Sequence, residues 1–383
     1  MQVLFRLFTI LLFLPLSLCA VTNNEAPPED SVSFKPKSIR KVMERVADWQ
    51  LNSWKTTPPK YAMTDWVAAA GYTGILALSD ISKSKKYVKS LVKIGEKLDW
   101  NTGPRRFFAD DYCIGQTYSI LYMKYQDEKM IARWRQLADS IVTMPHTESL
   151  EWKKGIVLRE WAWCDALFMG PTALGYLATA TGEQKYLDIA SQLWWKTTDY
   201  LYDSTEHLYF RDGSFLDKKE KNGRKVFWSR GNGWVLAGLA RVLVNMPADY
   251  KDRARFEALY KDMAATIISL QQPDGSWYSS LLDPSSYNIK ETSGTGFYAY
   301  ALLWGMNNGL LSKEATWPVV KKAWGSLVIA VQPDGKLGYV QPIGFAPDKV
   351  DANSTEAYGV GAFLLAGSEL HKFIGQNSAL AAQ

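Results

Sequence analysis

The stretch CDALFMGPTALGYLATAT (164–181), followed closely by EQKYLDIASQLWWKTTDYLY (183–202), decides the fold of this chain. The first segment carries apolar and small residues all around, which is typical of a helix inside a protein. The second places large apolar side chains at helical spacing with charged side chains between them, which is typical of a helix at a surface. The two segments predict an inner helix joined by a short turn to an outer helix.

The same pair of segments recurs along the chain. An apolar segment precedes an amphipathic one at 66–78 and 84–98, 114–125 and 129–142, 232–246 and 254–271, and 295–311 and 316–332. An amphipathic helix at 35–54 and an apolar helix at 357–374 have no partner of their own. If these two pack together, six helical hairpins close into a ring. The sequence therefore predicts an all-α fold, an (α/α)6 barrel, with an open helical solenoid as the second interpretation.

Three loops after outer helices, at 201–215, 271–283 and 331–342, each hold a turn signal between short apolar or aromatic runs. They predict short β-hairpins at one end of the barrel. The segments that precede the inner helices all reach this same end. Helix N-termini also meet there, and their unpaired N–H groups suit an anionic ligand. We expect the active site at this end.

The chain opens with MQVLFRLFTILLFLPLSLCA, in which one Arg precedes an apolar run. This pattern predicts a signal peptide over 1–20 and export of the protein, to the periplasm or the medium. Lipoprotein processing at Cys19 is the second interpretation, because Leu18 is a poor residue before a lipidated cysteine. A polar leader (21–34), a single catalytic domain (35–376) and a C-terminal tail (377–383) follow, and we expect no membrane span.

Composition excludes several function classes. The chain has 44 Lys and Arg against 39 Asp and Glu, a mild and well mixed positive charge that does not indicate nucleic-acid binding. It has three His and no C-x-x-C or H-E-x-x-H motif, so we expect no metal site, no cofactor and no Ser-His-Asp triad. Beyond Cys19 only Cys113 and Cys164 remain; we expect buried free thiols, with a single bridge between them as the alternative.

Carboxylates and tryptophans recur in the segments that begin the inner helices. These segments hold Asp65-Trp66, Asp110-Asp111, Trp163-Cys164-Asp165, Trp228 to Trp234, Glu291-Thr292-Ser293 and Glu356. Flat aromatic faces beside acids are what a carbohydrate site needs. Asp165 stands within the apolar run WAWCDALFMG (161–170), where burial raises the pKa of a carboxyl group. Helix capping or structural pairing is the alternative role for each polar residue in these segments.

Five segments, in this order and spacing, resemble a known family. They are FFADDYCIGQTY (107–118), WAWCDALFMGP (161–171), YFRDGSF (209–215), FWSRGNGWVLAGLARVL (227–243) and ETSGTGFYAYAL (291–302). They look like the unsaturated rhamnogalacturonyl and glucuronyl hydrolases, glycoside hydrolase family 105 and the related family 88. The likeness extends from about residue 40 to 374.

The resemblance implies an (α/α)6 barrel that removes a 4,5-unsaturated uronic acid from the non-reducing end of oligosaccharides made by polysaccharide lyases. In the family, one aspartic acid protonates the vinyl ether double bond and then deprotonates the water that adds to it. Asp165 matches this general acid/base. Asp110 or Asp111 matches a second aspartate that holds the sugar, and Asp111 is the preferred candidate.

The resemblance also implies substrate contacts. Trp163, Trp228 and Trp234 match aromatics of the sugar subsite, and Arg230 matches an arginine that suits a carboxylate or sugar hydroxyls. Arg211 stands where well-known members have a histidine, and a second family histidine has only His146 or Lys154 as local candidates. The sugar beyond the cleaved bond is therefore expected to differ from theirs. We add Thr292 and Ser293, which begin an inner helix, as substrate-binding candidates.

Two other functions fit the same residues. The chain could be an inverting glycosidase that acts on saturated glycosides with Asp165 and Asp111 as its two carboxylates. It could also be a non-catalytic protein that binds glycans in an aromatic cleft, because a fold alone does not establish an activity.

Overall fold

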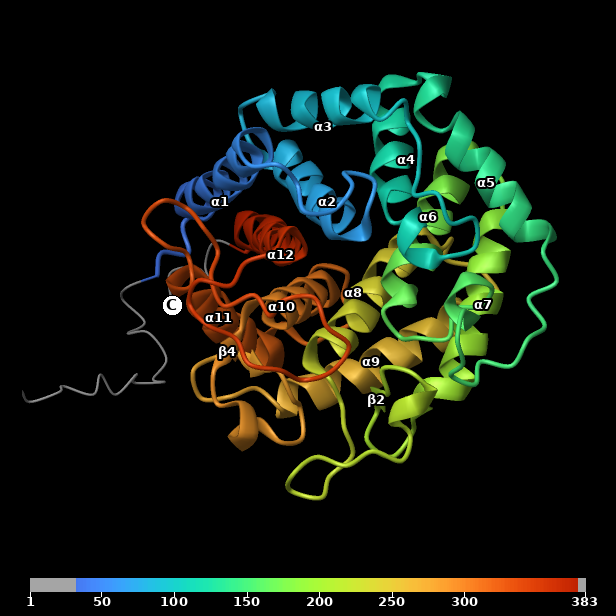
Figure 1. Cartoon of the computed structure of the whole chain (residues 1–383). Coiled ribbons are helices and arrows are strands. Elements are labelled where there is room, and N and C mark those ends of the chain that lie inside the picture. Colours follow the sequence, from blue (N-terminus) through green and yellow to red (C-terminus); the bar gives the residue numbers. More distant parts are fainter. Residues whose placement is uncertain (1–31, 378–383) are drawn as a thin grey trace, which may run out of the picture.

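The computed structural model describes residues 32–377 and shows two concentric rings of helices (Figure 1). The inner ring consists of α2 (Trp66–Ile81), α4 (Ile114–Tyr125), α6 (Ala166–Thr181), α8 (Ser229–Asn245), α10 (Thr292–Asn307) and α12 (Ala357–Gln376). The outer ring consists of α1 (Pro36–Thr56), α3 (Lys86–Lys97), α5 (Ala132–Thr143), α7 (Lys185–Leu201), α9 (Arg253–Ser269) and α11 (Lys313–Ile329). The predicted inner and outer helices are confirmed.

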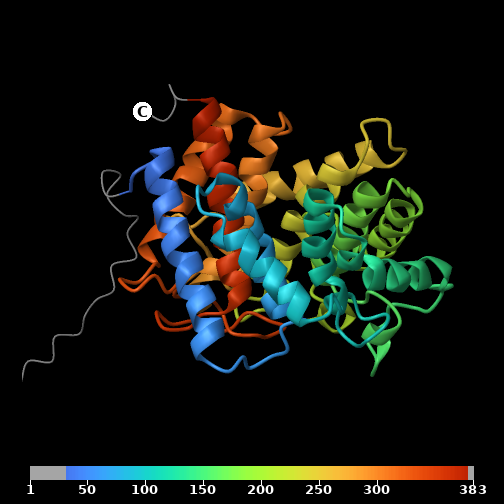
Figure 2. The same ribbon diagram turned by 90° about the horizontal axis from the view of Figure 1, so that it is seen from above.

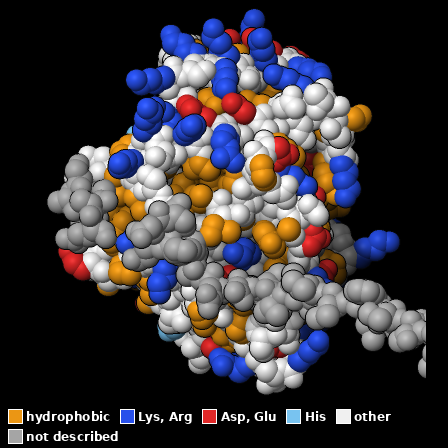
Figure 3. Space-filling model, turned by 90° about the vertical axis from the view of Figure 1, so that its left-hand side faces the viewer, with side chains coloured by type: hydrophobic (Ala, Val, Ile, Leu, Met, Phe, Trp, Pro, Cys, Tyr) orange, Lys and Arg blue, Asp and Glu red, His pale blue; other side chains and the backbone are white. Residues whose placement is uncertain are grey.

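Burial separates the two rings as the apolar pattern predicts. Every residue of α10 from Thr292 to Met306 is buried, because this helix has neighbours on all sides. In α3 only Tyr87, Leu91 and Gly95 are buried, along one stripe at helical spacing. Figure 3 views the side of α1 and α11 and shows Lys and Arg side chains gathered at the top, where Figure 1 places α3.

The ring is closed between its first and last inner helices. α12 packs against α2 and α10, and α1 packs against α12, so that α1 and α12 run side by side (Figure 2). The backbones of α2 and α12 meet at glycines, because a Cβ added to Gly74 would lie only 2.4 Å from the carbonyl oxygen of Gly361. The (α/α)6 barrel is therefore confirmed, and the open solenoid is excluded.

The few strands are two residues long. β1 (Tyr202–Asp203) pairs with β2 (Leu208–Tyr209) in an antiparallel hairpin, as predicted for 201–215. β3 (Trp277–Tyr278) pairs instead with β4 (Lys290–Glu291), so the predicted hairpin within 271–283 is wrong. The loop at 331–342 holds a single antiparallel bridge between Val331 and Leu337. The loops before the inner helices lie together at one mouth of the barrel.

Some predictions concern residues at the ends of the chain. The predicted signal peptide, Cys19 and most of the polar leader lie outside the described residues, as do residues 378–383 of the predicted tail. Among residues 32–377, no helix has the length and apolar character needed to cross a bilayer. Cys113 and Cys164 are both buried free thiols, so the alternative of a bridge between them is wrong.

Candidate active site

A cavity of about 420 Å³ opens at the mouth where the inner helices begin. It is lined by Trp66, Asp110, Trp163, Asp165, Met169, Arg211, Trp228, Ile343, Gly344 and Phe345. Trp66 is the first residue of α2, Asp165 directly precedes α6 and Trp228 directly precedes α8. The predicted position of the site, at the N-terminal ends of the inner helices, matches this cavity.

Asp165 does not cap the helix that it precedes. Its carboxylate accepts no hydrogen bond from the first turn of α6, although the residue is only 9 % exposed. Its described polar neighbours are the Cys164 thiol, with Sγ 3.5 Å from Oδ2, and Arg211, with Nε 3.9 Å from Oδ2. Burial raises the pKa of Asp165, and the positive charges of Arg211 and Arg230 offset part of that rise.

Asp110 is the second carboxylate of the cavity. It lies in a short 3-10 helix (Ala109–Tyr112) and is 9 % exposed, and its carboxylate has no hydrogen bond to the described residues. Burial, with the nearby negative charge of Asp165 as the next cause, raises the pKa of Asp110 well above its ordinary value. Two carboxyl groups in one cavity resist ionising together, so the pair holds a proton more tightly than an isolated carboxyl group does.

Asp111, which the sequence analysis favoured as the second acid, does not line the cavity. Its carboxylate accepts hydrogen bonds from the Arg105 backbone N–H (2.6 Å), Nε (3.0 Å) and Nη2 (2.6 Å). The side chain of Asp111 is 1 % exposed in this arrangement. Asp110 therefore lines the same cavity as Asp165, whereas Asp111 anchors the loop that holds Arg105.

Arg211 is the positively charged residue among those that line the cavity. The backbone N–H of Cys164 donates to the Arg211 carbonyl at 2.9 Å, and Trp163 and Asp212 form an antiparallel bridge, so the segment after β2 lies against the start of α6. Nη1 of Arg211 donates to Asp212 at 2.6 Å, which anchors the side chain. Nε is buried and has no hydrogen-bond partner among the described residues.

Aromatic rings form the walls. Trp163 stacks on Phe108, with ring centroids 5.3 Å apart and planes 22° apart, and Trp66 stacks on Tyr358 at 5.2 Å and 20°. The Trp228 indole N–H donates to Oε1 of Gln341 at 2.9 Å. Packing partners fix each indole, and flat, rigid faces of this kind suit sugar rings.

Arg230 is buried behind the cavity wall and is not one of its lining residues. Its guanidinium lies between the rings of Trp228 and Tyr358, 4.5 and 4.9 Å from their centroids. It donates to the carbonyl oxygens of Gln341 (2.6 Å) and Pro342 (3.0 Å), which directly precede the lining residues 343–345. Arg230 therefore holds the loop that completes the cavity, a role that the sequence did not indicate.

Three other predicted substrate contacts lie away from the cavity. Trp234 is 1 % exposed and packs on Phe168 and Phe297 in the barrel core. The Thr292 hydroxyl donates to the Gly338 carbonyl, and the Ser293 hydroxyl donates to Glu291 at the start of α10. These side chains support the barrel and its loops, because their polar atoms are used inside the protein.

Part of the lining carries no signal in the sequence. Ile343, Gly344 and Phe345 come from the loop between α11 and α12, which carries no acid or recognised motif at this point, and Met169 belongs to an apolar face of α6. Trp66 had a signal, because it follows Asp65 at the start of an inner helix. His146 and Lys154, the local candidates for a second family histidine, are not lining residues.

The cavity combines two carboxyl groups with raised pKa, one arginine and three indole rings. Such groups can donate a proton to a sugar, remove one from water and hold an anionic sugar by its carboxylate. No group of three or more His, Cys, Asp or Glu side chains within residues 32–377 is placed to hold a metal ion. Acid–base chemistry on a saccharide is what these lining residues can perform.

Comparison with known proteins agrees with this chemistry. The model of glycosyl hydrolase family 88 matches residues 39–374. An unsaturated 3S-rhamnoglycuronyl hydrolase from Formosa agariphila is 40% identical over 333 residues, which cover 83% of this chain and 88% of that protein.

Solved structures are also similar to this chain. A glycosyl hydrolase family 88 protein from Bacteroides vulgatus has a TM-score of 0.79 and 32% identity, covering 88% of this chain and 99% of its own. A protein described as a polysaccharide lyase has a TM-score of 0.80 and 33% identity, covering 89% and 98%. The chain belongs to glycosyl hydrolase family 88 and is a glycoside hydrolase of the unsaturated uronyl hydrolase type.

Proposed function

We propose that Asp165 and Asp110 remove an unsaturated uronic acid from the non-reducing end of an oligosaccharide in which the next sugar is a rhamnose. The observation that carries this proposal is the pairing of these acids, both with raised pKa, in one tryptophan-walled cavity beside Arg211. The choice of rhamnose rests on the 40% identity to the Formosa enzyme, which is named for a 3S-rhamnoglycuronyl substrate.

Asp165 is the proposed general acid and base. In its protonated form it donates the proton to C4 of the C4=C5 double bond, which leaves positive charge shared between C5 and the ring oxygen. A water molecule gives up a proton to the Asp165 carboxylate and adds to C5. The resulting hemiketal opens at the bond between C5 and the ring oxygen, and the hemiacetal left at C1 then releases the remaining sugar. One water is consumed, and Asp165 recovers its proton.

Asp110 and Arg211 prepare this step. Burial, with the nearby charge of Asp165 as the next cause, raises the pKa of Asp110, and a carboxyl group at this place can hydrogen-bond a sugar hydroxyl as donor or as acceptor. Arg211 has a buried Nε without a hydrogen-bond partner among the described residues and is already anchored on Asp212, so its unused N–H groups suit the uronate carboxylate. Burial of both side chains supports these roles because electrostatic interactions are stronger at low dielectric.

The test is the ultraviolet absorbance of the double bond in lyase-generated oligosaccharides. The proposal expects the absorbance to fall with time, and Asp165→Asn to slow the fall by about 10²-fold or more, the usual contribution of a general acid or base. Asp199→Asn, an exposed carboxylate on α7, is the matched control and should retain the wild-type rate. A rise in absorbance on an intact polymer would instead mean a lyase.

Two further outcomes separate the remaining alternatives. Turnover of saturated glycosides alone would favour an inverting glycosidase, and tight binding without turnover would favour a glycan-binding protein. A substrate with rhamnose as its second sugar that is turned over no faster than one with another second sugar would contradict the proposed second sugar. These substrate comparisons all use the wild-type protein. The Asp165→Asn variant tests the role of Asp165 separately.

We also propose export, on the strength of the N-terminal apolar run at 1–20. The mass of the mature protein tests this. Cleavage after Ala20 gives an unmodified chain that begins at Val21, whereas lipoprotein processing leaves an acylated Cys19. A full-length chain in the cytoplasm would contradict both.

A further inference from the structure

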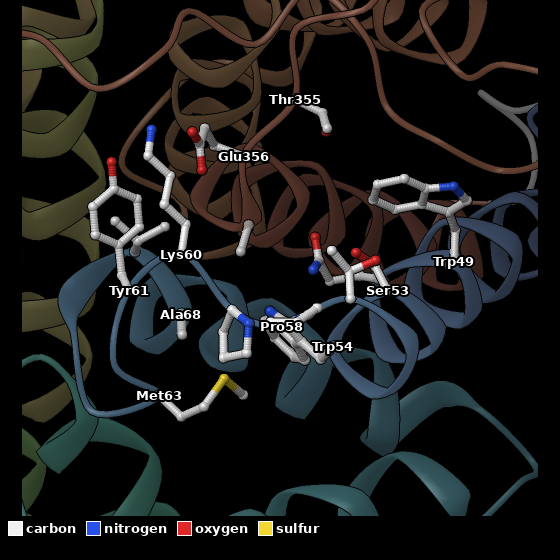
Figure 4. A pocket seen from close by; sticks show the side chains of 15 residues that line it. Trp49, Ser53, Trp54, Pro58, Lys60, Tyr61, Met63, Ala68, Thr355 and Glu356 are labelled. Atoms are coloured by element: carbon white, nitrogen blue, oxygen red, sulfur yellow. The ribbon is translucent and has the colours of Figure 1, made fainter.

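A second hollow, of about 190 Å³, lies on the same mouth of the barrel as the acid cavity. It is enclosed by the C-terminal half of α1, the loop between α1 and α2, and the start of α12 (Figure 4). The two hollows are neighbours, because Trp66 lines the acid cavity and the next residues, Val67 and Ala68, line this one. Trp66 also stacks on Tyr358. The two residues that precede Tyr358, Glu356 and Ala357, line the second hollow.

Two polar groups in this hollow lack partners. Gln50 lines the hollow and is 5 % exposed. Its side-chain amide has no hydrogen bond to the described residues. The Thr355 hydroxyl oxygen is buried and also has no partner there. Burying a hydroxyl without a hydrogen bond is unfavourable, so a protein rarely keeps such a group for stability alone. Together they offer donors and acceptors to a bound molecule.

Aromatic rings and charged side chains form the other walls of the hollow, which include Trp54, Tyr61, Lys60 and Glu356. Trp54 is held edge-to-face against Tyr72, with centroids 5.2 Å apart, and Nζ of Lys60 lies 5.2 Å from the ring centroid of Tyr61. In Figure 4, Trp54 and Pro58 lie on the α1 side and Glu356 and Thr355 on the opposite side. Aromatic faces beside hydrogen-bonding groups are a combination that suits sugar rings.

The size of the hollow limits its ligand. Pockets that enclose drug-sized ligands hold about 300–1,000 Å³, so 190 Å³ suits one sugar ring rather than a longer segment. We propose that this hollow is a second saccharide subsite that binds one sugar residue through Gln50, Thr355 and Trp54. The proposal rests on the proposed function, because the saccharide comes from the same mixture of oligosaccharides. The sugar belongs either to the far end of the substrate in the acid cavity or to a separate chain.

The variant Gln50→Leu tests the subsite, with Gln136→Leu, exposed on the outer helix α5, as its matched control. Turnover of an unsaturated disaccharide and of a tetrasaccharide from the same lyase digest is measured for each protein. If the substrate itself spans both hollows, wild type prefers the tetrasaccharide, and Gln50→Leu lowers the tetrasaccharide-to-disaccharide ratio of kcat/KM by about tenfold, the value of one to two hydrogen bonds. Gln136→Leu keeps the wild-type ratio.

Calorimetry with a saturated tetrasaccharide from the same polymer identifies a separate chain. The separate chain is supported if wild type binds this tetrasaccharide, Gln50→Leu does not bind it, and turnover shows no preference for substrate length. An unchanged ratio together with unchanged saturated-tetrasaccharide binding overturns the subsite, and a higher Tm for Gln50→Leu would then fit a purely structural glutamine. If Gln50→Leu does not fold, Thr355→Val carries the same comparison. A wild-type protein that turns over neither substrate refutes the proposed function instead, while the calorimetric comparison still decides whether the hollow binds a saccharide.

Discussion

Nε of Arg211 lies 3.9 Å from Oδ2 of Asp165, close enough for the two charges to interact but too far for a hydrogen bond. The guanidinium is held in place by its bond to Asp212, and it leaves Nε without a partner among the described residues. Burial raises the pKa of Asp165, and the positive charge of Arg211 offsets part of this rise. It also keeps one buried donor beside the acid for an anionic group of the substrate.

Arg211→Met should move the pH profile of kcat to higher pH on its alkaline side. Asp165 must be protonated to act as an acid, and removing the nearby positive charge raises the pKa of its carboxyl group further. KM should rise about tenfold or more, because a charge-assisted bond to the uronate is lost. Arg211→Lys keeps the charge and should leave the alkaline limb near its wild-type position. An alkaline limb that stays in place or moves to lower pH in Arg211→Met would contradict the role of this arginine.

The neighbours Asp110 and Asp111 should affect stability in opposite directions. The raised pKa of Asp110 means that the folded protein binds this proton more tightly than the unfolded chain does, so the stabilisation is present in acid and is lost as pH rises. Asp110→Asn should therefore raise Tm near pH 7 by at least about 2 °C, with a smaller gain near pH 4. Thermal unfolding at both pH values measures the difference.

Asp111→Asn should lower Tm at neutral pH. The carboxylate accepts three hydrogen bonds from Arg105, and losing its charge should cost about 1–3 kcal/mol, below the range for a fully buried pair because the arginine is 44% exposed. The same unfolding series serves as the check. A stabilised Asp111→Asn beside a destabilised Asp110→Asn would reverse the assignment of the two carboxylates.

The seam between α2 and α12 should tolerate no side chain at Gly361. A Cβ there would lie 2.2 Å from the Ala70 carbonyl oxygen, a distance that forces the two backbones apart. We expect Gly361→Ala to destabilise the protein by about 1–3 kcal/mol or more, measured by denaturant unfolding. Gly375→Ala lies on the same helix with nothing within 4 Å of the new Cβ, and it should be neutral or stabilising. Equal effects of the two variants would mean that the ring does not close through this contact.

The sequence predicts the helices well because the spacing of apolar and charged residues repeats over several turns within each segment. The inner segment 164–181 and the outer segment 183–202 differ in how charge is distributed around the helix, and the structure places α6 and α7 there. The pairing of β3 could not be found in this way. Its strand has two residues, and its partner Lys290–Glu291 lies beyond an intervening loop, so neither alternation nor a tight turn indicates the register.

The sequence likewise indicates some residues of the site and not others. Asp165 is recognisable in the sequence because burying an unpaired carboxylate among large apolar residues costs free energy, so such an acid indicates a function. The choice between Asp110 and Asp111 depends on which side of one short 3-10 helix each carboxylate leaves, and the adjacent letters contain no such information. Ile343 and Phe345 were missed because they carry no charge and reach the cavity only through contacts that Arg230 and Gln341 make across the fold.

The loop that Arg230 holds should control the sugar beyond the cleaved bond. Ile343 and Phe345 line the cavity although they are 39% and 62% exposed, which leaves their apolar faces open to a ligand. Phe345→Ala should raise KM for an unsaturated disaccharide about tenfold, because one aromatic contact with a sugar contributes about 1 kcal/mol or more. Tyr125→Ala, which removes an exposed ring at the C-terminal end of α4, should leave KM unchanged.

Arg230→Lys tests whether the arginine acts through this loop. A lysine cannot donate in one plane to the carbonyls of both Gln341 and Pro342, so the loop should lose its fixed position while the positive charge remains. We expect a loss of kcat/KM for the disaccharide similar to that of Phe345→Ala, and a much smaller loss for an unsaturated uronide whose leaving group is only methanol. An equal loss for both substrates would mean that Arg230 contacts the uronic acid directly. The comparison distinguishes the two roles because the methyl uronide has no second sugar to contact the wall formed by residues 343–345.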